Sequence, residues 1–349
     1  MKKIKLSFIG VGLQSQIAHI VNFHKDKRVE LFDIADFDKG LALEVHKGFG
    51  FSGIVTNSVD KLIARKPDGV VITVQRPLTA GLVKKCLKAG LHVLSEKPHV
   101  FCLKEHNECE KLQNKSVWMK GYNKRWALAA IEFDKNYKKY LRLYGKLISV
   151  EMFIDSGNSW LGSKHHAEPT LKRKKSLGRK NEYPKWIKGK NKFLYESNWN
   201  FVSHFMDLLE FFNFKKIKNF KSYIGSKVFK SMFEATKLSH SFIVNVSYSK
   251  LNHNGWNEFV TFTFESAKIT LRYKSPMQKG GSCNLEIMDS NKSELSIKSY
   301  KNDWTYETQD FNFINQIMSL KKGKFKKIYN GRISIATYEK IWKSLLKNN

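Results

Sequence analysis

The sequence contains little cysteine, proline or arginine, and it has no long apolar run. Its four cysteines (Cys86, Cys102, Cys109 and Cys283) form no CxxC pair and no disulfide framework, so we expect reduced thiols. No apolar segment approaches the roughly 18 residues that a transmembrane helix needs. The first residues, MKKIKLSFIG, run into a glycine-rich turn without a small-residue cleavage site. These features predict a soluble, cytoplasmic protein.

Acidic residues are also scarce, with 31 Asp and Glu against 62 Lys and Arg, which gives a formal net charge of +31. A positive charge of this size makes nucleic acid or an anionic surface a candidate partner. However, 53 of the cations are Lys and only 9 are Arg, whereas planar, bidentate phosphate contacts favour Arg. Plentiful Lys, Phe, Asn and Ile are typical of an AT-rich genome. We therefore expect neither a nucleic-acid nor a membrane partner.

The 349 residues are long enough for two domains. Over residues 1–122, short β-branched runs alternate with helical stretches, as in βαβ units around a parallel sheet. This pattern predicts an N-terminal α/β Rossmann domain. Expected strands cover 4–10, 29–36, 69–74 and 92–98, and expected helices cover 14–25 and 78–89. Ligands of such sheets bind beyond the carboxyl ends of the strands.

Residues 123–349 have a different pattern, in which apolar side chains recur at every second position. One face is shared by Phe242, Val244, Val246 and Tyr248, and another by Val260, Phe262 and Phe264. The pattern predicts a substrate-binding and oligomerisation α+β domain with a large, mostly antiparallel sheet covered on one face. Expected helices cover 201–212, 311–320 and 333–346, and the basic stretch 164–192 is expected to be a loop.

A glycine-rich turn follows the first expected strand. Gly10 permits the tight turn, and Gly12 lets the backbone, with Leu13 and Gln14, approach a pyrophosphate at a helix N-terminus. Ser15 stands at the third glycine position. Asp36 ends the second strand, where a carboxylate accepts from ribose hydroxyls. A plain structural turn is the alternative, but the combined pattern predicts a dinucleotide site. Asp36 would repel a 2′-phosphate and Phe37 supplies no cation, which favours NAD over NADP.

Glu96-Lys97-Pro98 ends a later strand of the same sheet. A lysine at this edge lies beside the nicotinamide, where its ammonium group can donate to a substrate hydroxyl and stabilise an oxyanion. The alternative is an ordinary solvated lysine.

Four motifs in order resemble the Gfo/Idh/MocA family of oxidoreductases, which includes glucose-fructose oxidoreductase and inositol dehydrogenase. They are IGVG with Asp36, the stretch 68–99 ending in EKPH, GYNKRW at 121–126 and NFVSHFMDLL at 200–209. The resemblance implies hydride transfer, in which Lys97 holds the reacting hydroxyl and His204 takes its proton. It also implies that Glu96 and Lys97 lie at the cofactor. For an isolated histidine we would favour a core role instead.

The sequence departs from the family pattern at several positions. Asn200 stands where the family has Asp, one helical turn before His204. Its amide can bind a substrate hydroxyl but cannot stabilise an imidazolium as a carboxylate does. Gln75-Arg76 replaces Pro-Asn, and Gln75 still offers polar contacts to the cofactor; Thr79 replaces a frequent His. Asp207 either orients His204 or serves local packing.

In the GYNKRW segment, the resemblance implies that Asn123 reaches the cofactor and that Arg125 or Trp126 reaches the substrate pocket; packing at the domain boundary is the alternative for Trp126. The basic stretch 164–192 either binds an anionic substrate, such as a nucleotide-sugar or a sugar acid, or is a solvated charge run. His165-His166 lacks the further ligands of a metal site, so we expect no metal.

The sequence therefore predicts an NAD-dependent sugar or polyol dehydrogenase that acts on a ring hydroxyl in surface carbohydrate biosynthesis. By resemblance it forms a homodimer or homotetramer. One alternative is a redox-neutral sugar-modifying enzyme with tightly bound NAD. Another is a non-catalytic, NAD-binding regulatory protein, which Asn200 favours and which Lys97 and His204 oppose.

Overall fold

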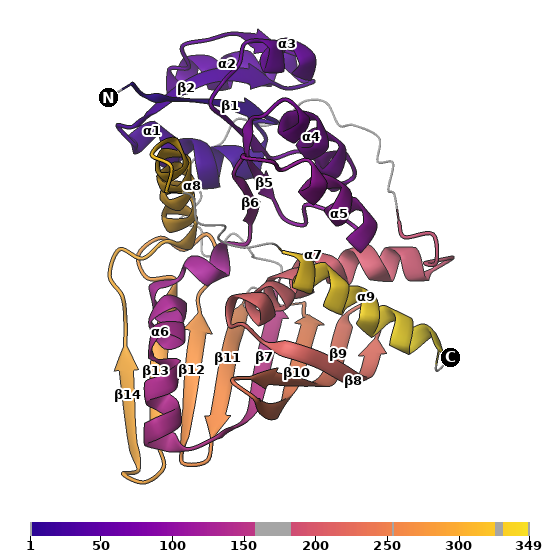
Figure 1. Cartoon of the computed structure of the whole chain (residues 1–349), viewed down its shortest axis with the longest axis vertical. Coiled ribbons are helices and arrows are strands. Elements are labelled where there is room, and N and C mark those ends of the chain that lie inside the picture. Colours follow the sequence, from indigo (N-terminus) through magenta and orange to yellow (C-terminus); the bar gives the residue numbers. More distant parts are fainter. Residues whose placement is uncertain (1, 158–182, 253–254, 325–330, 348–349) are drawn as a thin grey trace. The chain divides into compact units, whose positions relative to one another are not determined.

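The structure is a computed structural model that describes residues 2–157, 183–252, 255–324 and 331–347. The chain divides into two compact units, each made of segments that are distant in sequence (Figure 1). The first contains Met1–Tyr122, Glu168–Pro184 and Tyr306–Arg332, and the second contains Asn123–Ala167, Lys185–Thr305 and Ile333–Asn349. A segment near the C-terminus thus packs with the N-terminal unit.

The first unit is built on a parallel sheet. Within the described residues its strands lie in the order β3 (Val55–Thr56), β2 (Val29–Ala35), β1 (Ile4–Ile9), β4 (Gly69–Ile72), β5 (His92–Glu96) and β6 (Trp118–Gly121). Every neighbouring pair is parallel. This strand order is that of a Rossmann fold, with its reversal between β1 and β4. The predicted α/β Rossmann architecture is confirmed.

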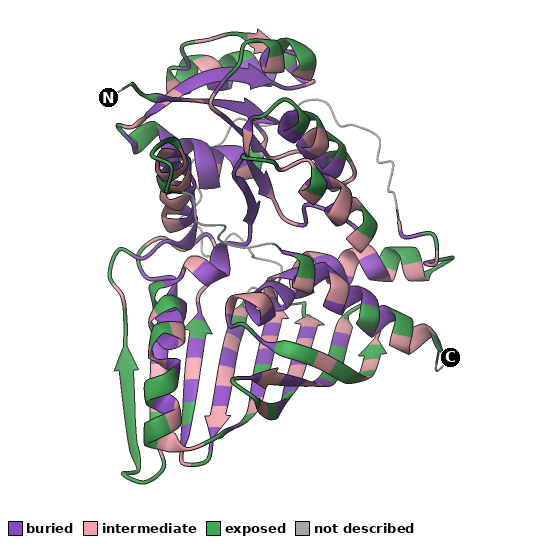
Figure 2. Ribbon diagram, in the orientation of Figure 1, coloured by how far each residue is buried: buried purple, intermediate pink, exposed green. Residues whose placement is uncertain are grey.

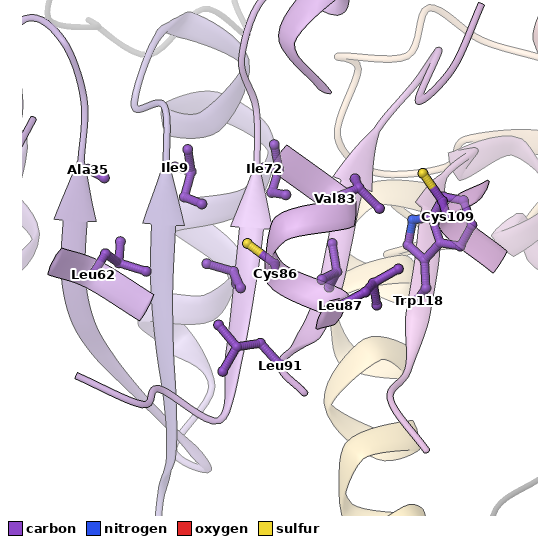
Figure 3. Close-up of a cluster of buried hydrophobic side chains, with 12 residues drawn as sticks. Ile9, Ala35, Leu62, Ile72, Val83, Cys86, Leu87, Leu91, Cys109 and Trp118 are labelled. Atoms are coloured by element: carbon purple, nitrogen blue, oxygen red, sulfur yellow. The ribbon is translucent and has the colours of Figure 1, made fainter. Parts of the chain in front are cut away.

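Helices cover both faces of this sheet. They are the π-helical segment η1 (Ser15–Ile20), α1 (Val21–Lys25), α2 (Lys39–Phe49), α3 (Val59–Ala64), α4 (Arg76–Lys88), α5 (Leu103–Lys111) and α8 (Thr305–Lys321). On one face, α4 packs its Val83, Cys86 and Leu87 onto Ile9 and Ile72 (Figure 3). On the other, the Phe8 ring meets that of Phe23 from α1 at 6.1 Å. The central strands are therefore buried on both sides, which explains their continuous apolar runs.

The second unit contains a larger sheet. Its described strands lie in the order β14 (Glu294–Lys298), β13 (Cys283–Asp289), β12 (Ala267–Tyr273), β11 (Trp256–Phe264), β7 (Leu147–Ser156), β10 (His240–Lys250), β9 (Val228–Lys237) and β8 (Lys215–Ile224). The pair β7 and β10 is parallel, and the other pairs are antiparallel. The predicted mostly antiparallel sheet is confirmed.

One face of this sheet is covered by helices, and the alternating burial along its strands is visible in Figure 2. The covering elements are the 3₁₀ turn η2 (Asn123–Trp126), α6 (Leu128–Tyr144), α7 (Asn191–Phe211) and α9 (Arg332–Lys347). Phe133 of α6 stacks on Phe262 of β11 at 3.9 Å, and Phe201 of α7 stacks on Tyr248 of β10 at 4.5 Å. The side chains predicted to share the covered face are all buried.

Three helix predictions need correction. The helix expected at 311–320 begins six residues earlier, at Thr305. The helix expected at 201–212 begins ten residues earlier, at Asn191, so Asn200 lies inside α7 and does not precede it. The helix expected at 14–25 starts as a π-helix and becomes α-helical only at Val21. Among the described residues, no helix has the length and apolar character needed to cross a membrane.

Candidate functional site

The glycine-rich turn between β1 and η1 is pinned to the neighbouring strands. Gly10 has a φ of +85°, and a Cβ atom there would lie 2.8 Å from the Thr73 carbonyl oxygen. Its amide donates to Ala35 O at 2.9 Å, and the Thr73 hydroxyl donates to Gly10 O at 2.6 Å. Only glycine fits this conformation and this space. The turn therefore occupies a fixed place at the carboxyl edge of the sheet.

Asp36 lies at the same edge, directly after β2, and only 5% of its surface is exposed. Its Oδ2 accepts a hydrogen bond from the Val11 amide at 2.8 Å, and its Oδ1 accepts from the Asp38 amide at 2.9 Å. Hydrogen bonds to an ionised acceptor are stronger than neutral ones. The carboxylate is thus held against the glycine-rich turn, as a ribose ligand at this position requires.

A pocket of about 690 Å³ lies at this edge, within the roughly 300–1,000 Å³ of typical ligand pockets. Six residues predicted for the cofactor line it: Gly10, Gly12, Leu13, Gln14, Asp36 and Gln75. The sequence did not indicate the other lining side chains, which include Asn57, Val59, Leu78, Leu82 and Lys85.

The pocket residues fit a dinucleotide. The glycine-rich turn that leads into the helix beginning at η1 lines the pocket with Gly12, Leu13 and Gln14. The backbone N–H groups at the N-terminal end of a helix favour phosphate oxygens. Asp36 and Asn57 offer hydrogen-bonding groups for a ribose, and Val59, Leu78 and Leu82 offer apolar contacts for a base. The residue types therefore match a nicotinamide dinucleotide, NAD or NADP, with its phosphates, riboses and flat rings.

Glu96 ends β5 and Lys97 follows it, and neither is among the residues that line this pocket. Glu96 Oε2 accepts from the Lys97 amide at 3.0 Å, and Glu96 Oε1 lies 3.0 Å from His19 Nε2. Both carboxylate oxygens of Glu96 therefore bind groups of the protein itself. The family resemblance implied that Glu96 lies at the cofactor. In the structure, the Glu96 carboxylate accepts a hydrogen bond from the Lys97 backbone amide.

His19 lies fully buried between two carboxylates. Its Nδ1 is 2.9 Å from Asp310 Oδ1, and Asn22 Nδ2 donates to Asp310 Oδ2 at 2.9 Å. Burial alone would lower the pKa of His19, but Asp310 and Glu96 outweigh it and raise the pKa to about 10. The imidazole is therefore protonated at neutral pH. Nothing in the sequence indicated this network.

The His19 network makes stability depend on pH. Because the pKa of His19 is raised from 6.5 to about 10, its contribution is complete below pH 6.5 and is lost as the pH rises through 10. We expect the free energy of unfolding to fall by about 3 kcal/mol more between pH 7 and 9.5 than in His19→Gln, which does not titrate. Urea unfolding of both proteins across this range measures the difference. Parallel pH profiles would contradict the assignment.

In the second unit, α7 carries Asn200 and His204 one helical turn apart, and both side chains are half-buried. Arg125 lies buried in η2 and binds the Asp207 carboxylate through Nε and Nη2, both at 2.8 Å. Asp207 thus takes part in an ion pair with Arg125, a contact that the sequence did not indicate. The guanidinium of Arg125, which was predicted for the substrate, is engaged within the unit.

Asn123 and Trp126 flank Arg125 in η2. Asn123 Nδ2 donates to Thr305 Oγ1 at 2.9 Å, within the second unit. The indole Nε1 of Trp126 is buried and has no hydrogen-bond partner among the described residues. The basic residues Lys172, Arg173, Lys174, Lys175, Arg179 and Lys180, and the pair His165-His166, lie outside the described residues.

The fold and the pocket define a two-part protein with an NAD(P)-binding Rossmann domain. Residues 4–119 match the model of the Gfo/Idh/MocA oxidoreductase family, described as having an NAD-binding Rossmann fold. The first unit is therefore similar, over residues 4–119, to the dinucleotide-binding domain of this oxidoreductase family. None of the curated proteins matches the chain in sequence.

Solved structures share the fold over the whole chain. The dehydrogenase MviM from Clostridium difficile superposes with a TM-score of 0.68 and 15% identity, over 100% of both chains. KijD10, a 3-ketoreductase from Actinomadura kijaniata in complex with NADP and TDP-benzene, has a TM-score of 0.71 and 10% identity, over 98% of each chain. At such identities the likeness establishes the fold and leaves the substrate open.

Proposed function

We propose that this protein is an NAD-dependent oxidoreductase that moves a hydride between a ring hydroxyl of a sugar and nicotinamide. The observation that carries the proposal is the pocket at the reversal of the strand order, with Asp36 held against the glycine-rich turn. The family match over residues 4–119 supports it. A nucleotide-sugar is a suitable substrate class, because the structurally similar KijD10 binds TDP-benzene and this chain is strongly cationic.

We assign the following roles in the reaction to residues of this protein. Bound NAD supplies the hydride acceptor at the nicotinamide ring. The Lys97 ammonium group donates a hydrogen bond to the reacting hydroxyl oxygen and stabilises the charge that develops on it. The His204 imidazole accepts the proton of that hydroxyl. Asn200, one turn earlier on α7, binds a neighbouring hydroxyl through its amide.

The assay for this function is NAD reduction against free sugars, inositols, sugar acids and nucleotide-sugars. Turnover that is lost in both Lys97→Ala and His204→Ala would support the proposal. NAD binding without turnover on any class, with NAD retained through purification, would favour the redox-neutral alternative. A protein that does not bind NAD would overturn the proposal.

Asp36 should select NAD over NADP, because its carboxylate would repel a 2′-phosphate. Lys85, a cation that could attract a 2′-phosphate, also lines the pocket. However, its Nζ pairs with the Asp60 carboxylate at 2.7 Å. We expect Asp36→Asn to raise the Kd for NAD about tenfold, as loss of a charge-assisted hydrogen bond does, and to narrow the preference over NADP. Isothermal titration measures both constants. Asp38→Asn is the matched control, because Asp38 is buried nearby but caps α2 outside the pocket. Stronger NADP binding by the wild type would contradict the expectation.

We also propose that the uncovered face of the second sheet forms a homodimer interface. Apolar side chains gather on its outward positions, where Phe153 stacks on Phe259 at 4.9 Å and Ile243 and Met232 are exposed. Despite the net charge of +31, the charged residues at outward positions on β7 and β9–β13 are nearly balanced. They are Glu151, Asp155, Glu234, Glu286, Lys230, Lys268 and Arg272. Two copies can therefore approach without strong repulsion.

We expect Ile243→Glu to shift the protein from dimer to monomer, because it places a charge on this face, which the dimer would bury. Light scattering coupled to size-exclusion chromatography measures the mass. Leu43→Glu is the control, because Leu43 is also exposed but lies on α2 of the first unit. An unchanged dimer in Ile243→Glu, or a monomeric wild type, would reject this interface.

A further inference from the structure

A buried chain of hydrogen bonds connects α8 to the backbone of Lys97. It begins at Asp310, whose Oδ1 lies 2.9 Å from His19 Nδ1. His19 Nε2 then lies 3.0 Å from Glu96 Oε1, and Glu96 Oε2 accepts from the Lys97 amide at 3.0 Å. All four residues belong to the first unit. This chain of hydrogen bonds therefore joins η1, α8 and the end of β5 at one point.

Each link is fixed by further contacts. Asn22 Nδ2 bridges Asp310 Oδ2 at 2.9 Å and the Ala18 carbonyl oxygen at 2.7 Å, so Asp310 is also tied to the helix that carries His19. On the opposite side, a Cβ atom on Gly121 of β6 would lie 3.1 Å from Glu96 Oε1. The backbone of Gly121 thus closes the space around the Glu96 carboxylate. This carboxylate has little freedom to rotate.

The same helix also contacts the residues of the dinucleotide pocket. The Tyr306 ring of α8 packs edge-on against His19 at 5.8 Å, and the Gln14 side chain lies near its hydroxyl. Gln14 lines the pocket. The segment that returns to the first unit late in the sequence therefore contacts both the glycine-rich turn and, through His19, the Lys97 segment.

A packing role alone does not explain the charges in this chain of hydrogen bonds. Two carboxylates and an imidazolium are buried together, and such groups are costly to desolvate. Apolar residues of similar volume would join α8 to the sheet at no such cost. In some proteins a buried ionic group is retained because it fixes a specific geometry, and the group whose geometry it would fix here is the Lys97 backbone.

We propose that His19 and Asp310 are positioning residues for Lys97, which act by fixing the Glu96 carboxylate that holds the Lys97 amide. The inference rests on the role proposed above for Lys97. It assigns to α8 a part in catalysis that its position in the sequence does not indicate.

The test compares Asp310→Ala with Asp310→Asn, which keeps an oxygen that can accept from His19. Asp33→Ala is the matched control, because Asp33 is a fully buried carboxylate of the same sheet that binds Arg65 at 3.0 Å. Gly121→Ala is a second variant, which crowds Glu96 without removing a charge. The readouts are hydrogen exchange of the Lys97 amide, NAD affinity, melting temperature and, with a substrate, kcat and KM.

We expect Asp310→Ala and Gly121→Ala to speed exchange of the Lys97 amide about tenfold, the effect of losing one hydrogen bond. They should lower kcat by a similar factor and leave the Kd for NAD unchanged. In Asp310→Asn, the exchange rate of the Lys97 amide and kcat should both return most of the way to their wild-type values. Asp33→Ala should lower the melting temperature and leave the exchange of the Lys97 amide at the wild-type rate.

The proposal is overturned if Asp310→Ala and Asp33→Ala lower the melting temperature alike and neither changes exchange at Lys97. It is also overturned if exchange changes in Asp310→Ala but kcat does not, while Lys97→Ala is inactive. Activity that survives in Lys97→Ala would instead refute the proposed role of Lys97. The exchange measurement needs no substrate, so the two failures are distinguishable.

Discussion

Lys97→Ala is expected to slow hydride transfer by about 100- to 10,000-fold, because a positioned donor to a developing oxyanion contributes this much. The affinity for NAD should change by less than about threefold, since the loss falls on the transition state. Lys97 is outside the residues that line the dinucleotide pocket, and its backbone is held by Glu96. Single-turnover formation of NADH, together with titration of NAD, separates the two effects.

Two further variants sharpen this expectation. Lys97→Arg should remain slow, because a planar guanidinium does not replace a compact ammonium group at a geometrically demanding site. Lys88→Ala is the control for charge, since Lys88 is exposed at the end of α4. A large loss of NAD affinity in Lys97→Ala would make Lys97 a cofactor ligand. Wild-type turnover in Lys97→Ala would remove it from the reaction.

The sequence predicted those parts of the fold that local periodicity determines. Val244 and Phe262 are buried because alternation places them on the covered face of their strands. The beginning of α7 was not predictable, because Lys190 provides no side-chain cap and the first turn contains no acidic residue. Nothing in the sequence of Tyr306–Arg332 indicates that it packs with the first unit.

In the candidate site, too, features with local sequence signals were predicted and long-range contacts were not. Gly10 and Asp36 were recognisable because turn chemistry and strand ends are local signals, and both line the pocket. The contact between His19 and Asp310 joins residues 291 positions apart, so no local pattern reveals it. Arg125 was assigned to the substrate from its motif alone, although its guanidinium binds a carboxylate 82 positions away. Long-range ion pairs depend on tertiary packing, which a single sequence does not display.

The pair between Arg125 and Asp207 gives the last prediction. Arg125 is 5% exposed and Asp207 is fully buried, and the guanidinium also lies 5.4 Å from the centre of the Phe211 ring. Arg125→Met leaves a buried carboxylate without its cation, so we expect a loss of about 3–5 kcal/mol in the free energy of unfolding. Urea unfolding followed by tryptophan fluorescence measures the loss.

The double variant Arg125→Met, Asp207→Leu distinguishes a structural from a substrate role. Replacing both members of a buried ion pair by apolar residues is often neutral or stabilising, so the double variant should regain most of the stability that Arg125→Met loses. If Arg125 serves the fold, the KM for substrate should recover together with stability. If Arg125 binds the substrate, KM should stay high in the stable double variant. The second outcome would restore the motif-based assignment and make Asp207 the residue that orients Arg125 toward the substrate.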